Sequence, residues 1–270
     1  MKLLIIGQGA WSKKILTALN LEHPLIRTQS ISARECLRGI ADLNSLSAEF
    51  DVIWICTKPN WQLEILGQLS KFPRKIIIEK PYLFDPASFG LIIDFISTSA
   101  GVLQLSEPWT VKEIWAQAKL EILQERPAKL HITRGGNTAH PYLNEVEDWL
   151  PHDINLLFDL YGIEILESEI SDIQWEDNNK EVKFLIRKFD GAEIQMHSGK
   201  LKGERKALWE STNLRIDFME SSITRNSQTQ KITQPKNPFF LQIQESNQYD
   251  RERLANQLKV QNFFRASLFR

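Results

Sequence analysis

Residues 1–20 read MKLLIIGQGAWSKKILTALN, and this stretch predicts a strand, a tight turn and a helix in succession. An apolar run leads directly into Gly7 and Gly9, after which Ile15, Leu16 and Leu19 fall on one side of a helix. A buried strand that passes through glycines into a helix is how a doubly wound parallel sheet begins. The chain therefore opens with the first unit of an α/β domain.

The same alternation continues over the first hundred residues. A weaker strand is expected within residues 24–31, and clearer apolar strands within 50–59, 74–81 and 101–107. Helices are expected after Asn60 and after Asp85, where Asp85 would be the N-cap and Pro86 the first helical residue. Near-continuous apolar strands separated by helices indicate a parallel sheet that is covered on both faces. We assign residues 1–106 to a Rossmann-type α/β domain.

The pattern changes in residues 107–270, which we assign to a second domain. Alternating strands are expected in KLHITRG, EVKFLIRKF, AEIQMHSGK and LRIDFMESS, and Asp190-Gly191 is a hairpin signal between two of them. One helix is expected within DWLPHDINLLFDLYG, with Pro151 in its first turn and Gly162 at its end. The second domain is therefore predicted to be α+β, with a mostly antiparallel sheet that serves substrate binding and oligomerisation.

Composition narrows the classes of function. The 270 residues carry a formal net charge of −1, which does not favour nucleic acid as a partner. No apolar run has the length of a membrane span, so we expect no membrane association. Two cysteines, Cys36 and Cys56, and five histidines without a ligand-like spacing predict neither a disulfide framework nor a metal site. A cytoplasmic location fits this composition.

The glycine turn predicts a bound dinucleotide. GQGAWS places Gly7 and Gly9 after the first strand, with Ser12 where a third glycine is usual. The acidic residue that binds the ribose of NAD about 20 positions later is missing, and the region from Arg27 to Arg34 supplies arginine and serine instead. These side chains could hold a 2′-phosphate, so the cofactor is NAD or NADP, with a slight preference for NADP.

Two further motifs combine polar residues with well-defined positions. The fourth strand ends on Glu79-Lys80-Pro81, and in parallel sheets the carboxyl ends of strands face the ligand. Asp148 and His152 are expected at the start of the helix in the second domain, where the helix dipole would keep the histidine neutral. Lys80 could stabilise charge on a substrate oxygen, while His152 could transfer its proton. Sequence alone leaves the division of proton transfer between them open.

Taken together, GQGAWS, VIWICTKPN, IIIEKPYLF and DWLPHDINLL resemble the glucose-fructose oxidoreductase and inositol dehydrogenase family of two-domain enzymes. The resemblance covers roughly residues 1–220 and implies NAD(P)-dependent hydride transfer to or from a sugar, nucleotide sugar or cyclitol. It implies that Lys80, Asp148 and His152 are the catalytic residues. Gln62 departs from the family, because many members have histidine at that position. Members commonly form dimers or tetramers through the open face of the second sheet, which implies the same here.

The remaining expected contacts follow the strand ends and one loop. Cofactor contacts are expected from Gly7, Gly9, Ala10, Trp11, Ser30, Arg34, Thr57, Pro59, Asn60, Glu79 and Lys80. The loop TRGGNTAHPYLNEVED offers Arg134, Asn137, His140 and Tyr142 for substrate recognition. Two alternatives stay open: a non-catalytic NAD(P)-sensing protein of the same fold, and a reductase of a non-sugar substrate such as a cyclic imine or a tetrapyrrole.

Overall fold

The structure is a computed structural model, and it describes residues 1–39, 42–69, 72, 74–80, 86–99, 101–137, 143–188, 190–244 and 251–269. The chain divides into two compact units. Unit 1 comprises Met1–Pro108 and Lys236–Asn262, and unit 2 comprises Trp109–Pro235 and Phe263–Arg270. Residues 107–270 were predicted to form the second domain, whereas residues 236–262 belong to unit 1 in the structure.

Unit 1 contains a five-stranded sheet in which every pairing is parallel. Its strands are β1 (Lys2–Ile6), β2 (Arg27–Ile31), β3 (Val52–Ile55), β4 (Lys75–Ile78) and β5 (Val102–Leu105), in the order β2-β1-β3-β4-β5. The predicted Rossmann-type sheet is thereby confirmed. The strand order reverses beside β1, and ligands of such sheets bind at the carboxyl ends of the strands at this point.

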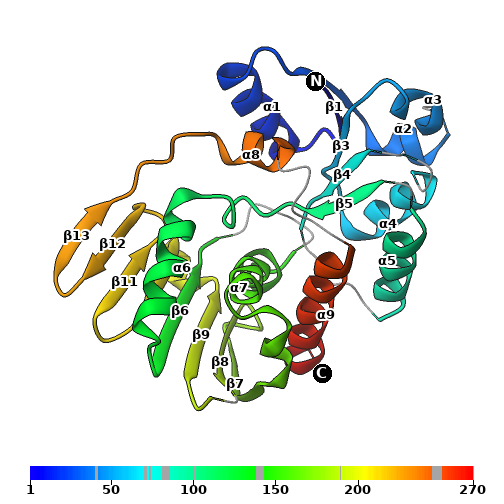
Figure 1. Cartoon of the computed structure of the whole chain (residues 1–270). Coiled ribbons are helices and arrows are strands. Elements are labelled where there is room, and N and C mark those ends of the chain that lie inside the picture. Colours follow the sequence, from blue (N-terminus) through cyan, green and yellow to red (C-terminus); the bar gives the residue numbers. More distant parts are fainter. Residues whose placement is uncertain are drawn as a thin grey trace. The chain divides into compact units, whose positions relative to one another are not determined.

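Helices cover both faces of the parallel sheet, as the continuous apolar strands require (Figure 1). One face packs against α1 (Ala10–Glu22) and α8 (Pro238–Gln244). The other packs against α2 (Ala33–Leu37), α3 (Leu43–Ser47), α4 (Pro59–Gln68), α5 (Pro86–Thr98) and the first part of α9 (Arg251–Leu268). Asp85, the expected N-cap of α5, lies outside the described residues.

The end of the chain completes the core of unit 1. Phe239 and Ile243 of α8 are buried beside Trp54 and Ile77, and Leu254 and Leu258 of α9 belong to the cluster on the opposite face. The buried Lys75 ammonium donates a hydrogen bond to the carbonyl of Gln242, near the C-terminus of α8, where the helix dipole favours a cation. The sequence that flanks these residues of α8 and α9 is polar, and only a few apolar residues of the two helices reach the core. The packing is therefore hard to predict from the sequence.

Unit 2 is built on an eight-stranded sheet of order β13-β12-β11-β10-β6-β9-β8-β7. The strands are β6 (Lys129–Gly135), β7 (Glu169–Glu176), β8 (Glu181–Arg187), β9 (Glu193–Gly199), β10 (Lys206–Glu210), β11 (Leu214–Asp217), β12 (Ser222–Arg225) and β13 (Gln228–Lys231). Only β6 and β9 pair in parallel among these strands, so the predicted mostly antiparallel sheet is confirmed. The predicted hairpin joins β8 to β9, and Gly191 in it has a φ of 84°.

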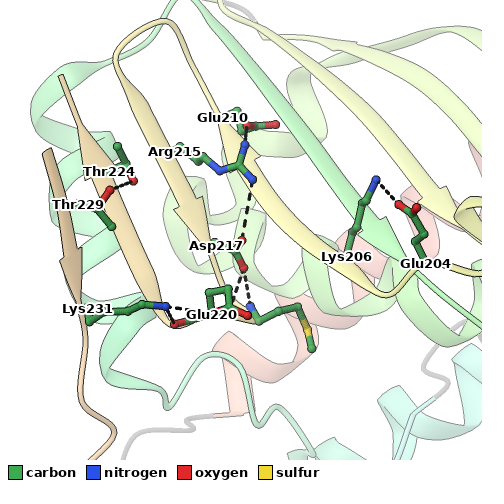
Figure 2. Close-up of polar contacts among 10 residues, drawn as sticks. Glu204, Lys206, Glu210, Arg215, Asp217, Glu220, Thr224, Thr229 and Lys231 are labelled. Carbon is green, nitrogen blue, oxygen red and sulfur yellow. Dashed lines mark hydrogen bonds and ion pairs between the residues drawn. The ribbon is translucent and has the colours of Figure 1, made fainter. Parts of the chain in front are cut away.

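One face of this sheet is covered by α6 (Glu113–Glu125) and α7 (Glu145–Tyr161), and short 3-10 helices follow at Gly162–Glu167 and Leu201–Gly203. On the opposite face, the region of β10–β13 carries paired polar side chains (Figure 2). Across β10–β13, Arg215 pairs with Glu210 at 2.7 Å, and Thr224 bonds Thr229 at 2.8 Å. Neighbouring charges on this face therefore satisfy one another within the chain.

Candidate functional site

The turn after β1 depends on glycine at position 7. Gly7 has a φ of 134°, its N–H donates to the carbonyl of Ile31, and an added Cβ would lie 2.2 Å from the carbonyl oxygen of Cys56. Only glycine is tolerated where the backbone takes such a φ and a neighbouring strand end is so close. Gly7 is therefore required by the fold itself, whether or not a ligand binds there.

Gly9 differs, because nothing in the protein crowds it. It is the N-cap of α1, makes no side-chain capping bond, and an added Cβ would have no atom within 4 Å. Ser12, at the third fingerprint position, is buried and donates to the Gly9 carbonyl at 2.8 Å, which holds the turn. The first amides of a thirteen-residue helix thus point beyond the turn without a side chain over them, as anion binding requires. Of the neighbouring residues, Ala10 is exposed, whereas Trp11 packs edge-on against Phe239.

The second strand places its polar residues at both ends rather than at one. Ser30 lies near the carboxyl end of β2, and Arg34 is exposed in the first turn of α2, where its N–H bonds the Ser32 hydroxyl. Arg27 instead begins β2, at the amino end of the strand. The region that could hold a ribose phosphate therefore contains Ser30 and Arg34 but not Arg27.

The carboxyl ends of β3 and β4 are joined by one side chain. Gln62 of α4 is fully buried, and its amide nitrogen donates to the carbonyls of Thr57 and Glu79, each at 2.8 Å. Pro59 is the first residue of α4, and Asn60 beside it is exposed. Lys80 follows Glu79 directly and is half-buried. Pro81 lies outside the described residues.

Glu79 is a buried acid, and its carboxylate is bound within unit 1. It is 5% exposed, and its Oε1 accepts a hydrogen bond of 2.9 Å from Trp54 Nε1. Burial raises its pKa above the usual value, although hydrogen bonds and the nearby charge of Lys80 act in the opposite direction. Glu79 was predicted to contact a cofactor. In the structure its carboxylate accepts a hydrogen bond from Trp54 of the neighbouring strand.

In unit 2, α7 begins earlier than the sequence predicts. Asn144 and Glu147 form a capping box, so the helix starts at Glu145 and Pro151 lies inside it rather than in its first turn. The expected position of His152 in the first turn is therefore wrong. Tertiary packing overrides the cost of an internal proline, because α7 is buried along nearly its whole length. Asp148 remains in the first turn, one turn before His152 on the same face.

His152 is 7% exposed and lies beside an aromatic cluster. Its ring meets Trp109 edge-on with centroids 6.2 Å apart, and Trp109 also packs against Phe218. The guanidinium of Arg134 lies 4.7 Å above the Trp109 ring. Within unit 2 the structure thus brings Arg134 and His152 to neighbouring sides of one tryptophan.

Arg134 is part of a fully buried ionic cluster. Its Nε donates to Asp153 Oδ1 at 2.8 Å, the same oxygen accepts from Trp209 Nε1 at 2.9 Å, and both side chains of the ion pair are 0% exposed. Burial raises the pKa of Asp153, and the charge of Arg134 opposes this rise. Asp153 and Trp209 were not predicted from the sequence. The available signal was an acid that directly follows His152 in the middle of the helix.

The other residues predicted to bind substrate are only partly described. Asn137 is exposed after β6, while His140 and Tyr142 lie outside the described residues. The start of this loop is tied to α7 by Trp149, whose Nε1 donates to the Gly136 carbonyl at 3.1 Å. Lys80 belongs to unit 1, whereas Asp148 and His152 belong to unit 2.

Histidine, cysteine and acidic side chains within the described ranges form no cluster that could hold a metal ion. Across the same part of the chain, no helix combines the length and the apolar character needed to span a membrane.

Comparison with known proteins gives matches in structure only. No known family's sequence profile matches the chain, and no curated protein matches it. Similar solved structures include UDP-N-acetylglucosamine 3-dehydrogenase from Acidithiobacillus ferrooxidans, with a TM-score of 0.71 at 14% identity, covering 99% of this chain and 97% of that one. A 3-ketoreductase from Actinomadura kijaniata, solved with TDP-benzene and NADP, has a TM-score of 0.72 at 14% identity, covering 100% and 96%.

A third similar structure is the apo scyllo-inositol dehydrogenase from Lactobacillus casei, with a TM-score of 0.69 at 12% identity, covering 100% of this chain and 96% of that one. The protein therefore has the two-domain fold of these oxidoreductases along its whole length. For the fold, this confirms the expected likeness to the glucose-fructose oxidoreductase and inositol dehydrogenase family.

The buried ion pair generates a prediction about stability. Asp153→Ala should lower the free energy of unfolding by about 3–5 kcal/mol, because the Arg134 charge would stay buried without its partner. Replacing both residues by apolar ones, Arg134→Met with Asp153→Leu, should recover part of this loss. Recovery should be incomplete, because Trp209 would still lack its acceptor. Urea unfolding followed by circular dichroism measures these differences.

The matched control is Glu210→Ala, which breaks an exposed ion pair on the strand that carries Trp209. It should cost at most about 1 kcal/mol. A loss for Asp153→Ala no larger than that of the control would contradict a role for the buried pair in stability.

Proposed function

We propose that the protein is an NAD(P)-dependent oxidoreductase that transfers hydride between nicotinamide and a hydroxyl or carbonyl group of a sugar, nucleotide sugar or cyclitol. The observation that carries this proposal is the open N-terminus of α1 at Gly9, which lies at the carboxyl end of β1 where the strand order reverses. The named activities of the similar structures support the same chemistry.

The turn at Gly9 fits a dinucleotide pyrophosphate. The uncrowded Cα allows close approach of a phosphate, and the uncapped amides of α1 supply donors at the positive end of the helix dipole. The adenosine half would then lie over β2, near Ser30 and Arg34, and the nicotinamide half over β3 and β4. A cation and a hydroxyl beside the ribose, without a free carboxylate at the strand end, favour NADP over NAD.

Nicotinamide, when bound, supplies or accepts the hydride. His152 would take the proton from the substrate hydroxyl during oxidation and return it during reduction. Lys80 would hold the substrate oxygen and stabilise the negative charge that develops on it. Asp148, one helical turn before His152, would orient the imidazole or a substrate hydroxyl. The low exposure of His152 excludes bulk water from the proton it handles.

The alternatives differ in what they require of these residues. A nucleotide-sensing protein needs the glycine turn but no proton relay, so the presence of Lys80, Asp148 and His152 together favours an enzyme. A reductase of a cyclic imine or tetrapyrrole needs Lys80 but not the aspartate-histidine pair. A screen of sugars, nucleotide sugars, cyclitols, cyclic imines and tetrapyrroles for changes in nicotinamide absorbance separates the three. Turnover only with imines, or binding without any turnover, would favour an alternative.

Location and assembly are part of the proposal. The two cysteines are unpaired, which fits a reducing cytoplasm. We further propose a homodimer or homotetramer that associates through the open face of the unit 2 sheet. Because this face carries ion pairs rather than an apolar patch, association there would depend on charge complementarity.

The first prediction concerns the cofactor. Gly9→Val should weaken NADP binding by about 10²-fold or more, a loss of roughly 2.7 kcal/mol, because the side chain would occupy the space for the pyrophosphate. Gly67→Val, at another uncrowded glycine in α4, is the control and should leave affinity unchanged. Calorimetry gives both affinities, and the parent should bind NADP more tightly than NAD. Unchanged affinity in Gly9→Val would argue against this location of the pyrophosphate.

The second prediction concerns catalysis. Lys80→Ala should lower kcat by about 10²-fold, or roughly 2.7 kcal/mol of barrier, while NADP affinity changes little. His152→Ala should impair the same step, and the double variant should lose less than the product of the two single effects. Lys129→Ala, an exposed lysine of unit 2, is the control. Near-parental turnover of Lys80→Ala on the true substrate would remove Lys80 from the mechanism.

The third prediction concerns assembly. Light scattering at micromolar concentration should give the mass of a dimer or tetramer in low salt and a lower mass at about 1 M salt, where charges are screened beyond about 3 Å. A monomer in low salt would contradict the proposed oligomer. An oligomer that ignores salt would contradict only the proposed surface.

A further inference from the structure

The side-chain amide of Gln62 links two strand ends that no sequence motif connects. It is 0% exposed, and its Nε2 donates to the carbonyl of Thr57 and to the carbonyl of Glu79, both at 2.8 Å. The NH₂ group faces both carbonyls, and its two hydrogens allow one full hydrogen bond to each. A neutral histidine, the residue common at this position in the family that the sequence resembles, carries a hydrogen on only one ring nitrogen and therefore has one donor where glutamine has two.

The two bonded carbonyls lie where the backbone leaves the sheet. β3 ends at Ile55 and β4 ends at Ile78, and the ladder continues by one bond from Glu79 N–H to the Ile55 carbonyl, at 3.0 Å. Gln62 then spans the next step, from Glu79 back to Thr57. One side chain, that of Gln62, thus sets the distance between the two backbone segments that follow β3 and β4.

Glu79 is held on three sides as a result. Its N–H donates a hydrogen bond to the end of β3, and its carbonyl accepts one from Gln62. Its carboxylate accepts a third, from Trp54, at 2.9 Å. Lys80 is the next residue, so its Cα starts from a peptide unit with little freedom to move. Preorganisation of this kind matters where a cation must meet a charge that develops in the transition state.

We propose that Gln62 is a positioning residue that fixes the carboxyl ends of β3 and β4, and through them Lys80 and the surface for the nicotinamide half of the cofactor. This inference rests on the proposed function. In the proposed function, the adenosine half and the pyrophosphate bind at other elements, namely β2 and the turn at Gly9. Loss of Gln62 should therefore disturb one end of the bound dinucleotide and leave the other end in place.

The test uses Gln62→Met, which keeps the length of the side chain and removes both donors. NADPH binding is followed in two ways: calorimetry measures the affinity of the whole molecule, and the fluorescence of the reduced nicotinamide reports its own surroundings. Affinity should fall by no more than about tenfold, because each lost hydrogen bond contributes modestly and the phosphates stay bound. The change in nicotinamide fluorescence that accompanies binding to the parent should be lost.

Two further variants separate positioning from general damage. Gln68→Met replaces an exposed glutamine in the same helix and should behave as the parent in both measurements. Gln62→His retains one donor and should restore part of the fluorescence change, and it also serves where Gln62→Met does not fold. With a substrate in hand, Gln62→Met should lower kcat by a larger factor than it changes the KM for NADPH. Combined with Lys80→Ala, it should lower kcat little beyond the effect of Lys80→Ala alone.

The outcomes distinguish this inference from the function on which it rests. A parent that binds no NADPH overturns both. A parent that binds NADPH, together with a Gln62→Met variant of parental fluorescence, overturns the positioning role alone. Equal losses in Gln62→Met and Gln68→Met would also overturn it, because the effect would then belong to the helix and not to the two carbonyls.

Discussion

Parallel pairing is the constraint on which unit 1 depends. Because all five strands run the same way, each must end at the same edge of the sheet, and each connection must leave from that edge into a helix. The residues with the most restrictive surroundings are found there. Gly7 faces the Cys56 carbonyl, Gln62 spans two strand ends, and Glu79 is bound to Trp54. Segments far apart in the sequence therefore meet at the carboxyl edge of the sheet, although no sequence motif links them.

Unit 2 uses a different means to fix polar groups. α7 is buried on nearly all sides and yet includes Asp148, His152 and Asp153. Successive positions on a helix point about 100° apart, so His152 and Asp153 face different neighbours. Asp153 is bonded to Arg134 and Trp209 beneath the helix, and this bonding sets the rotation of α7 about its axis. The direction of the adjacent His152 follows from that rotation, even though Asp153 itself is inaccessible.

The alternation of apolar strands and helices, together with the glycine turn, was sufficient to predict both sheets and the class of fold. It failed where tertiary contacts decide. The start of α7 depends on an Asn144–Glu147 capping box that the internal Pro151 obscures, and α8 belongs to unit 1 because of two or three buried side chains. Arg134 was expected to contact substrate from a loop, whereas it lies in β6, is fully buried and is paired with Asp153. Local patterns predict local structure, whereas the partner of a buried charge is a property of the assembled chain.

The return of residues 236–262 to unit 1 has a consequence for how the protein is made. During synthesis the five parallel strands leave the ribosome before unit 2, but their sheet then lacks α8 on one face and the apolar residues of α9 on the other. The core of unit 1 can therefore close only after the whole of the intervening sheet has emerged. Until then the apolar strands of unit 1 lack part of their cover, and exposed apolar surface of this kind makes a folding intermediate prone to aggregation.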